Sequence, residues 1–462
     1  MSYLRYQHYK NSGIDWLGEV PNHWEVKRLR FVAKLNPSKS EINDLDRDTN
    51  VSFLPMDAIG EDGSLRLENE KPIKDVESGY TYFRDGDVTV AKITPCYENG
   101  KGALMQGLLN GIGFGTTELI VVRPKPNEVT GPYLNYIFTS PDFRNTGESH
   151  MYGAGGQKRV PDDFVRNFAT AFPSISEQTQ IAAFLDRETA KIDELAKAFN
   201  GLISLLKEKR QAVISHAVTK GLDPSVLMKD SGIEWLGQVP THWEVDRLKR
   251  STVSAKNGIW GDEAQQDEND IPCVRVADFD RQALRVELSE PTIRNVLEKE
   301  RVGRVLTEGD LLLEKSGGGE NQPVGFVVLY DYSRPAVCSN FVARVQTAHG
   351  MSSSFWRYVH AAAYAIRLNT KSIKQTSGIQ NLDASQYFDE RAAFPPHLEQ
   401  TQIATFLDRE TAKIDELTVE ARYAIELLQE RRTALISAAV TGKIDVRGLV
   451  NVVEEEKLLE TA

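Results

Sequence analysis

The sequence predicts an α+β protein made of two homologous domains, each followed by one long helix. The first observation is an internal repeat: residues 12–26 return 219 positions later as residues 231–245. The second is that residues 177–195 return as residues 399–417 with a single difference. The stretches of about 150 residues between these blocks hardly match. Constant ends around variable middles indicate one frame that presents two different surfaces.

The composition is typical of a globular protein. The 462 residues are enough for several domains, and 40% of them are hydrophobic and 26% charged. No apolar run approaches the roughly 20 residues that a membrane span needs, and Met1 is not followed by an apolar signal segment. The three cysteines lie far apart without metal-site spacing, which fits a reducing compartment. We therefore expect a cytoplasmic protein without membrane segment, disulfide or zinc site.

The net charge of −11 argues against nucleic-acid binding, because neutralising phosphates requires Lys and Arg. Net charge is a sum, however, and binding depends on the local distribution of charge. Part of the acidic excess lies at 454–456 and at Glu460, and part in the segment 262–270. The charge therefore lowers the expectation of DNA binding without excluding it.

Heptad patterns predict a long helix after each middle. The apolar seam of the first helix, over residues 177–219, comprises Ile181, Leu185, Ile192, Leu195, Phe199, Leu202, Leu206 and Val213. The seam of the second comprises Ile403, Leu407, Ile414, Leu417, Ala421, Ala424, Leu428 and Leu435. A long helix with one apolar stripe needs a partner, and its twin is the nearest candidate. Two unrelated surface helices are the alternative.

Start and stop signals bound these helices. Ser174 or Ser176 is a suitable N-cap, and Gly221 and Gly442 lie where helix stops are expected. A helix of about 43 residues would be roughly 64 Å long.

The variable middles predict mixed sheets with long loops and turns rich in Gly, Asn and Pro. The expected strands are the short β-rich runs at 88–91, 119–122, 310–313 and 325–329. Helices are expected at 131–143 and 352–368.

A common skeleton runs through both middles despite their low identity. Three pairs of segments correspond at an offset of 223 residues: Asp85–Asp87 with Glu308–Asp310, Lys92 with Lys315, and Gly155–Gln157 with Gly378–Gln380. Phe172 and Phe394 then return to an offset of 222, so one residue is expected to be lost after the Gly-Gln segments. The middles are therefore predicted to be homologous domains with diverged surfaces.

Motifs for catalysis are absent from the sequence. It contains no P-loop, no G-x-S-x-G and no H-E-x-x-H. Residues 36–39 are similar to the Asn-Pro-Pro-Tyr of amino-methyltransferases but lack the second proline and the aromatic residue that would stack on a flipped base. His8, Lys10 and Asp15 match a phosphodiesterase spacing that has no second copy, as a chance match would. We predict no catalytic, cofactor-binding or metal-binding residue.

Two lysines and two loops are the candidate nucleic-acid contacts. Lys92 and Lys315 each follow an expected strand and precede a turn, where a lysine can reach a phosphate. A solvated surface lysine is the alternative, but recurrence at one offset in divergent domains favours contact. The loop 155–159 combines glycines with an amide and two cations. The glycines allow the backbone to approach DNA closely, the amide can read adenine, and the cations suit phosphates or guanine. Its counterpart is 374–381; an ordinary polar turn is the alternative.

The complete set of predicted DNA-binding residues is Lys92, Lys101, Gly156, Gln157, Lys158, Arg159, Lys315, Lys374, Gln375 and Gln380. The repeated Trp and His residues are instead expected to be structural. His23 and His242 are predicted to be satisfied polar residues and not ligands.

The chain resembles the specificity subunits of Type I restriction–modification systems. Four features carry the resemblance: the Trp-Leu-Gly-x-Val-Pro-x-His-Trp blocks, the Gly-Asp…Lys strands, the Gly-Gln loops and the Phe-Pro…Glu-Gln-x-x-Ile-x-x-Phe-Leu-Asp helix entries. They cover essentially the whole chain. One departure is Phe172-Pro173-Ser174, where the family prefers consecutive prolines; the second half keeps Pro395-Pro396.

The resemblance implies target-recognition domains at 1–173 and 221–395 and antiparallel helical spacers at 174–220 and 396–445, with an acidic tail at 446–462. The domains would be held apart by the helices, and each would bind one half of a bipartite, asymmetric site in double-stranded DNA. Two methyltransferase (modification) subunits would dock on the chain, and restriction/translocase subunits would join them. S-adenosylmethionine, Mg²⁺ and ATP would belong to those partners.

Two other functions remain open from the sequence. A stand-alone DNA methyltransferase is disfavoured by the missing cofactor loop and missing Asn-Pro-Pro-Tyr. A coiled-coil scaffold that binds only protein would suit the acidic charge.

Overall fold

The computed structural model describes residues 3–154, 156–376 and 378–449, apart from the side chains of Gln375 and Thr376. The chain divides into two compact units, residues 1–198 with 424–462 and residues 199–423. Each long helix therefore contributes one half to each unit. The sequence-based boundaries, by contrast, place each helix in a segment of its own.

In the described part of the first unit, the strand order is β6-β5-β10-β7 in one sheet and β4-β11-β8-β9 in another. Their bounds are β4 Ala33–Leu35, β5 Asn50–Leu54, β6 Glu70–Pro72, β7 Thr81–Arg84, β8 Val88–Ala91, β9 Gly102–Leu104, β10 Ile112–Gly115 and β11 Leu119–Pro124. Strands β5 and β10 pair in parallel, and their other neighbours pair antiparallel. The remaining pairs are β1 (Tyr9–Asn11) with β2 (Glu19–Pro21), β3 (Glu25–Arg28) with β14 (Ala169–Phe172), and β12 (Tyr152–Ala154) with β13 (Gln157–Arg159).

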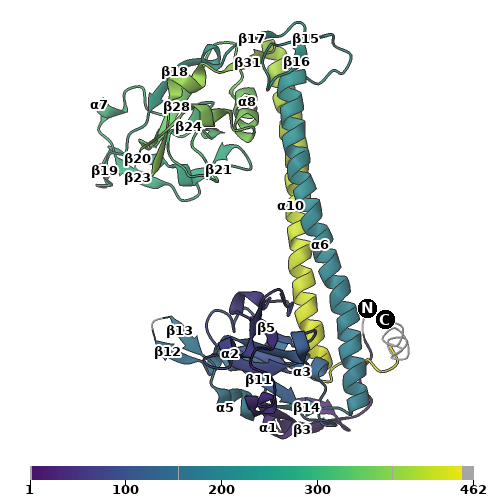
Figure 1. The fold of residues 1–462 in the computed structure, drawn as a ribbon. Coiled ribbons are helices and arrows are strands. Elements are labelled where there is room, and N and C mark those ends of the chain that lie inside the picture. Colours follow the sequence, from purple (N-terminus) through teal and green to yellow (C-terminus); the bar gives the residue numbers. More distant parts are fainter. Residues whose placement is uncertain (1–2, 155, 377, 450–462) are drawn as a thin grey trace. The chain divides into compact units, whose positions relative to one another are not determined.

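Short helices complete the first unit: α1 (Leu29–Val32), α2 (Ile73–Val76), α3 (Gly131–Thr139), α4 (Pro141–Ser149) and α5 (Asp162–Asn167). Helix α3 packs on β8, β9 and β11, on the side of the long helices (Figure 1). The single helix predicted over 131–143 is wrong, because it breaks at Ser140. Pro141 disfavours a helical residue before it, and the Ser140 hydroxyl accepts the Phe143 N–H and caps α4.

The second unit is also built from mixed sheets, but the number of strands in them differs. Its described sheets have the orders β18-β28-β24-β26-β22-β21, β19-β23-β20-β27 and β25-β30-β29, with the pairs β15-β16 and β17-β31. The bounds are β15 Met228–Asp230, β16 Gln238–Pro240, β17 Glu244–Arg247, β18 Thr252–Asn257, β19 Asp262–Glu263, β20 Asp270–Val274, β21 Phe279–Asp280, β22 Arg285–Val286, β23 Thr292–Asn295, β24 Leu311–Glu314, β25 Ser316–Gly317, β26 Val327–Leu329, β27 Val337–Cys338, β28 Val342–Thr347, β29 Ile373–Thr376, β30 Ile379–Leu382 and β31 Arg391–Phe394.

The short α-helices in the described part of the second unit are α7 (Glu298–Arg301), α8 (Ser353–Ala365) and α9 (Ala384–Phe388). The helix predicted over 352–368 is thus confirmed in place, but it ends earlier, because Arg367 adopts a left-handed conformation at φ 59°. The expected strands at 88–91, 119–122, 310–313 and 325–329 are all found within one or two residues as β8, β11, β24 and β26.

The long helices are α6 (Ile175–Lys220) and α10 (His397–Val440). Of the two proposed caps, Ser174 is confirmed: its hydroxyl accepts the Glu177 N–H at 3.3 Å. The predicted stops are confirmed as well, since Gly221 and Gly442 follow the helices with φ of 77° and 72°, which a glycine adopts without strain.

The two helices run antiparallel, as the resemblance implies. In the first unit, Ile181 and Leu185 near the start of α6 share a core with Leu435 and Ile436 near the end of α10. In the second unit the ends are exchanged: Ile214, Ala217 and Val218 of α6 share a core with Ile403, Ala404 and Leu407 of α10.

The predicted helix seam is only partly confirmed. Leu195, Leu202 and Leu417 are 51%, 42% and 49% exposed. One residue further on, Ile203 and Thr418 are buried instead. In a heptad seam the buried positions are separated by four and three residues in turn. In these parts of the helices the two spacings occur in the opposite order to the one predicted from the sequence. A threonine can occupy the seam because its hydroxyl donates to a carbonyl of its own helix, at 2.8 Å for Thr418.

A Tyr–Asp–Thr cluster joins each unit's globular part to a long helix. In the first unit the Tyr136 hydroxyl on α3 donates to Asp186 of α6 at 2.5 Å and lies 3.5 Å from the Thr189 hydroxyl. In the second unit Tyr358 on α8 makes the same contacts with Asp408 at 2.7 Å and with the Thr411 hydroxyl at 3.3 Å. The cluster is therefore a directional contact that both units share.

Candidate nucleic-acid interface

Lys92 and Lys315, here called the anchor lysines, occupy equivalent backbone positions. Each follows a buried strand, β8 or β24. The Lys92 N–H donates to the Glu118 carbonyl and the Lys315 N–H to the Phe341 carbonyl, both at 2.8 Å. The homology of the two middles predicted from the sequence is visible at this point, and Glu118 and Phe341 are equivalent positions.

A β-hairpin lies next to each anchor lysine and is hydrogen-bonded to it. The lysine carbonyl accepts an N–H at 2.8 Å from Val160 in the first unit and from Leu382 in the second. These residues are 222 positions apart. Gly156 and Gly378, which precede the second strands of the two hairpins, have φ of 80° and 83° and are also 222 apart. We call 152–159 the first hairpin and 373–382 the second hairpin.

The predicted match between Gln157 and Gln380 is therefore wrong by one residue, and Gln157 corresponds to Ile379. A shift of one residue moves a strand side chain to the other face of the hairpin. Gln157 is exposed, whereas Gln380 is only 8% exposed and its Oε1 accepts the Val324 N–H at 3.2 Å. The placement of Gln380 argues for a structural role. Ile379, which the sequence did not single out, is 52% exposed.

The first hairpin presents polar side chains on a fixed base. Gln157 and Lys158 are exposed, and Tyr152 is 67% exposed beside them. Arg159 is held back, because its Nη2 and Nε donate to the Glu118 carboxylate at 2.7 and 2.9 Å. The hydrogen bond from Arg159 is the main cause that holds the pKa of Glu118 below its ordinary value; burial opposes it, and the charges of Arg159 and Lys92 add to it. Gly155, which the sequence placed in this loop, lies outside the described residues.

The second hairpin is extended by β25 into a three-stranded sheet within the described residues. The exposed Lys374 donates to Asp383 at 2.7 Å, and the Ser316 hydroxyl donates to Asn381 at 2.6 Å. The side chain of Gln375 lies outside the described residues. Of the remaining predicted lysines, Lys315 donates to the Asn257 side chain at 2.7 Å and Lys101 to the Met56 carbonyl at 3.1 Å. The structure thus groups the predicted residues around each anchor lysine, while their contact with DNA stays a prediction.

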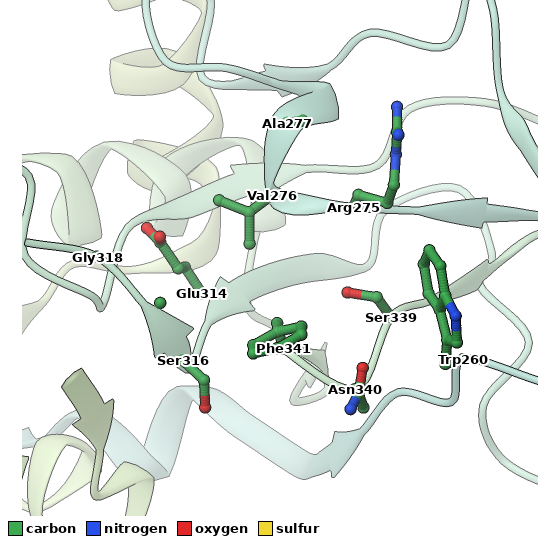
Figure 2. A pocket seen from close by; sticks show the side chains of 11 residues that line it. Trp260, Arg275, Val276, Ala277, Glu314, Ser316, Gly318, Ser339, Asn340 and Phe341 are labelled. Atoms are coloured by element: carbon green, nitrogen blue, oxygen red, sulfur yellow. The ribbon is translucent and has the colours of Figure 1, made fainter. Parts of the chain in front are cut away.

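Sequence reasoning missed a cavity beside the second hairpin. It has a volume of about 520 Å³, and Trp260, Arg275, Glu314 and Phe341 contribute to its wall (Figure 2). These residues are far apart in the chain, so no motif marks them. One available signal is that Phe341 stands where the first unit has Glu118.

The repeated His-Trp block is structural, as predicted. Glu177 accepts the Trp24 indole N–H at 3.1 Å, and its other oxygen lies 2.8 Å from His23 Nε2. Glu399 receives the same pair in the second unit, from Trp243 at 3.0 Å and His242 at 2.8 Å. Each block thus fixes its unit to the first turn of a long helix.

Residues 3–154, 156–376 and 378–449 contain no group of three or more His, Cys, Asp or Glu placed to hold a metal ion. No helix in this part of the chain has the length and hydropathy for crossing a membrane.

Curated proteins similar to this chain include specificity subunits of Type I restriction enzymes. The chain is 37% identical over 264 residues to the Type I restriction enzyme EcoAI specificity subunit of Escherichia coli, covering 55% of this chain and 43% of that protein. It is 35% identical over 263 residues to the EcoEI specificity subunit of the same species, covering 55% and 42%. The match thus spans less than half the length of these relatives. No family model matches the chain.

Solved structures share the fold over nearly the whole chain. A chain from a study of complex assembly and conformational transition of the type I R-M system has a TM-score of 0.71 at 17% identity, covering 93% of this chain and 99% of its own. The HsdS subunit from Thermoanaerobacter tengcongensis has a TM-score of 0.56 at 18% identity, covering 92% and 98%. The resemblance predicted from the sequence is therefore confirmed: the curated homologues of this chain are specificity subunits of Type I restriction enzymes, and it has the fold of an HsdS subunit.

Proposed function

We propose that the chain is a sequence-specific DNA-binding subunit that reads a bipartite, asymmetric site and directs partner methyltransferase and restriction subunits to it. The observation that carries the proposal is the pair of equivalent hairpins on one backbone frame with different exposed side chains. The first hairpin offers Gln157 and Lys158, and the second offers Ile379 and Lys374. An amide reads base edges by hydrogen bonds, whereas an apolar side chain can contact a thymine methyl. The two half-sites should therefore differ.

Phosphate contact in this proposal comes from the anchor lysines and from Lys158. The net charge of −11 shows that the chain as a whole is not basic. The partner subunits are expected to supply additional cations around the same duplex, since affinity for DNA rises with the number of phosphates neutralised. The names of the curated relatives, all Type I specificity subunits, support assembly with such partners.

The proposal assigns no catalytic step to this chain. S-adenosylmethionine, Mg²⁺ and ATP are assigned to the methyltransferase and restriction/translocase subunits, and the complex to the cytoplasm. The test is to incubate the purified chain with labelled S-adenosylmethionine and DNA, alone and with the partner subunits. Methylation by the chain alone would instead support a stand-alone methyltransferase.

Specificity is tested with the assembled complex. Sequencing of methylated bases in the host genome identifies the site, and fluorescence anisotropy then compares duplexes in which one or the other half-site is scrambled. Grafting residues 378–381 onto positions 156–159 should abolish discrimination at one half-site and preserve it at the other. The reciprocal graft is the matched control and should affect the opposite half-site. Assembly without any preference between duplexes would favour the protein-only scaffold.

A further inference from the structure

The cavity beside the second hairpin, here called the Trp260 cavity, has two aromatic walls. Trp260 is 39% exposed and Phe341 is 45% exposed, so both rings can be reached from solvent. In the view of Figure 2 the two rings stand apart, Trp260 at the right and Phe341 near the centre of the lining residues, with Ser339 and Asn340 between them. The volume of about 520 Å³ lies in the range of about 300–1,000 Å³ that ligand pockets occupy.

The walls of the Trp260 cavity are held in place by arginines. The Arg294 guanidinium lies 4.5 Å from the Trp260 ring centroid and donates to the carbonyls of Trp260 and Gly261 at 3.1 and 3.0 Å. Arg275 is oriented by Asp278, to which its Nη2 donates at 2.7 Å. The Trp260 side of the cavity is thus pre-organised, which lowers the ordering that binding would require.

The floor of the cavity connects it to the candidate DNA interface. Glu314 is 2% exposed, and its Oε2 accepts from Arg281 at 2.7 Å. Lys315 follows Glu314 directly, and Ser316 and Gly317 both line the cavity and pair with β30 of the second hairpin. A nucleotide in the cavity would therefore lie next to an anchor lysine.

The first unit shows that the frame does not require these walls. Phe341 is replaced there by Glu118, which carries the same backbone hydrogen bond from an anchor lysine. Glu314 is replaced by Ala91, which precedes Lys92 as Glu314 precedes Lys315. An aromatic ring at this backbone position is therefore not a packing need that both units share.

We propose that the Trp260 cavity receives one nucleobase turned out of the DNA duplex and stacks it against Trp260 and Phe341. This inference rests on the proposed function, because it assumes that the second unit lies on DNA. Every base offers a π face to an aromatic ring, and the cost of extrusion falls when the base has no pairing partner. Lys315, which directly follows the lining residue Glu314, is the cation proposed to neutralise a phosphate of the extruded nucleotide.

The test is an abasic scan of the complementary positions, with the full chain assembled with its partner subunits. An abasic site is placed opposite each base of the half-site read by the second unit, and binding is measured by competition. For the unmodified chain, one position should tighten binding about fivefold or more, because the opposite base is already unpaired. Phe341→Ala should lose that gain, whereas Phe341→Tyr should keep it.

Phe31→Ala is the matched control, because Phe31 is an exposed phenylalanine of the first unit at 57% exposure. It should leave the scan unchanged, and thermal unfolding should show that Phe341→Ala still folds. Positions of methylated bases are scored separately, since methyltransferases extrude their own target base. A scan without a tightened position, or the same gain in Phe341→Ala, overturns the inference. Equal binding of cognate and scrambled duplexes would instead overturn the proposed function.

Discussion

Glu118 in the first unit and Phe341 in the second show how one backbone position can carry two chemistries. Both carbonyls accept an N–H from an anchor lysine at 2.8 Å. The Glu118 side chain holds Arg159 at the base of a polar hairpin, whereas the Phe341 ring borders a cavity. Because the frame uses main-chain groups, the side chains at these positions can differ without disturbing it.

The parts that do not differ are those that join each unit to its helices. Glu177 and Glu399 accept the same His and Trp donors, and the Tyr–Asp–Thr cluster is also present in both units. Repeated sequence therefore marks attachment, and diverged sequence marks the surface proposed to read DNA. This division can be tested by comparing equivalent substitutions in the two units.

The largest effect is expected at the attachment. Glu177→Ala leaves the Tyr6, His23 and Trp24 donors without their acceptor and should lower the free energy of unfolding by about 3 kcal/mol. Glu399→Ala should lower it by about 1 kcal/mol, because the Glu399 side chain is 25% exposed against 6% for Glu177. Denaturant unfolding of the full chain measures both.

Glu194→Ala, an exposed glutamate of α6, is the control and should change stability little. Equal losses of free energy of unfolding for Glu177→Ala and Glu399→Ala would contradict the expectation that the more buried glutamate contributes more.

A smaller effect is expected for the readout. Gln157→Ala should reduce discrimination at a single base pair of one half-site by about 1–3 kcal/mol, since an amide can bond a base edge twice. Ile379→Ala, at the equivalent position, should act on the other half-site only. Competition binding with single-base substitutions measures both effects. An effect of either substitution on both half-sites would break the proposed division of labour.

The anchor lysines should act alike in spite of their different neighbours. Lys92→Ala and Lys315→Ala should each reduce the slope of log affinity against log salt concentration by about 1, with base preference unchanged. Titrations at several salt concentrations measure the slope, and the exposed Lys197→Ala on α6 is the control. An unchanged slope for Lys92→Ala would remove that lysine from the interface.

The smallest effect concerns pH. Arg159 lowers the pKa of Glu118 in the fold, so the stabilisation is fully present above the ordinary value of 4.5 and is lost as the pH falls through the lowered value. Glu118→Gln should reduce the melting temperature by about 1 °C at neutral pH, because the pair is partly exposed. The difference should vanish in acid. Phe341→Leu, which changes no ionisable group, should show no such pH dependence.

The ends of the long helices were predictable from their capping residues. The face on which the two helices contact each other was predicted only in part. Ser174 and Gly221 bound α6 through cap conformations that depend on a few neighbouring residues, and both were identified from the sequence. Part of the seam was misplaced by one residue, because a buried threonine such as Thr418 reads as polar in the sequence although its hydroxyl is satisfied within the helix. Apolar periodicity alone could not detect that.

The candidate site was predictable in outline for the same reason. Glycines beside cations marked the hairpins in the sequence. A chance Gly-x-Gln match, however, aligned Gln380 with Gln157. The strand pairing of the two hairpins shows that Gln157 is equivalent to Ile379. The Trp260 cavity as a whole was not predictable, since its lining residues between Trp260 and Phe341 are brought together only by the folded sheet. The difference between Phe341 and Glu118 marks only one of them.

The Tyr–Asp–Thr cluster has a mechanical consequence. A hydroxyl that donates to a carboxylate while lying against a threonine hydroxyl tolerates little rotation, unlike apolar surfaces, which can slide. Tyr136 and Tyr358 should therefore fix the tilt of each globular part on its rod to the same value. Replacing either tyrosine with phenylalanine would keep the ring but remove the hydrogen bond. The globular part of that unit should then vary in its tilt relative to the long helix.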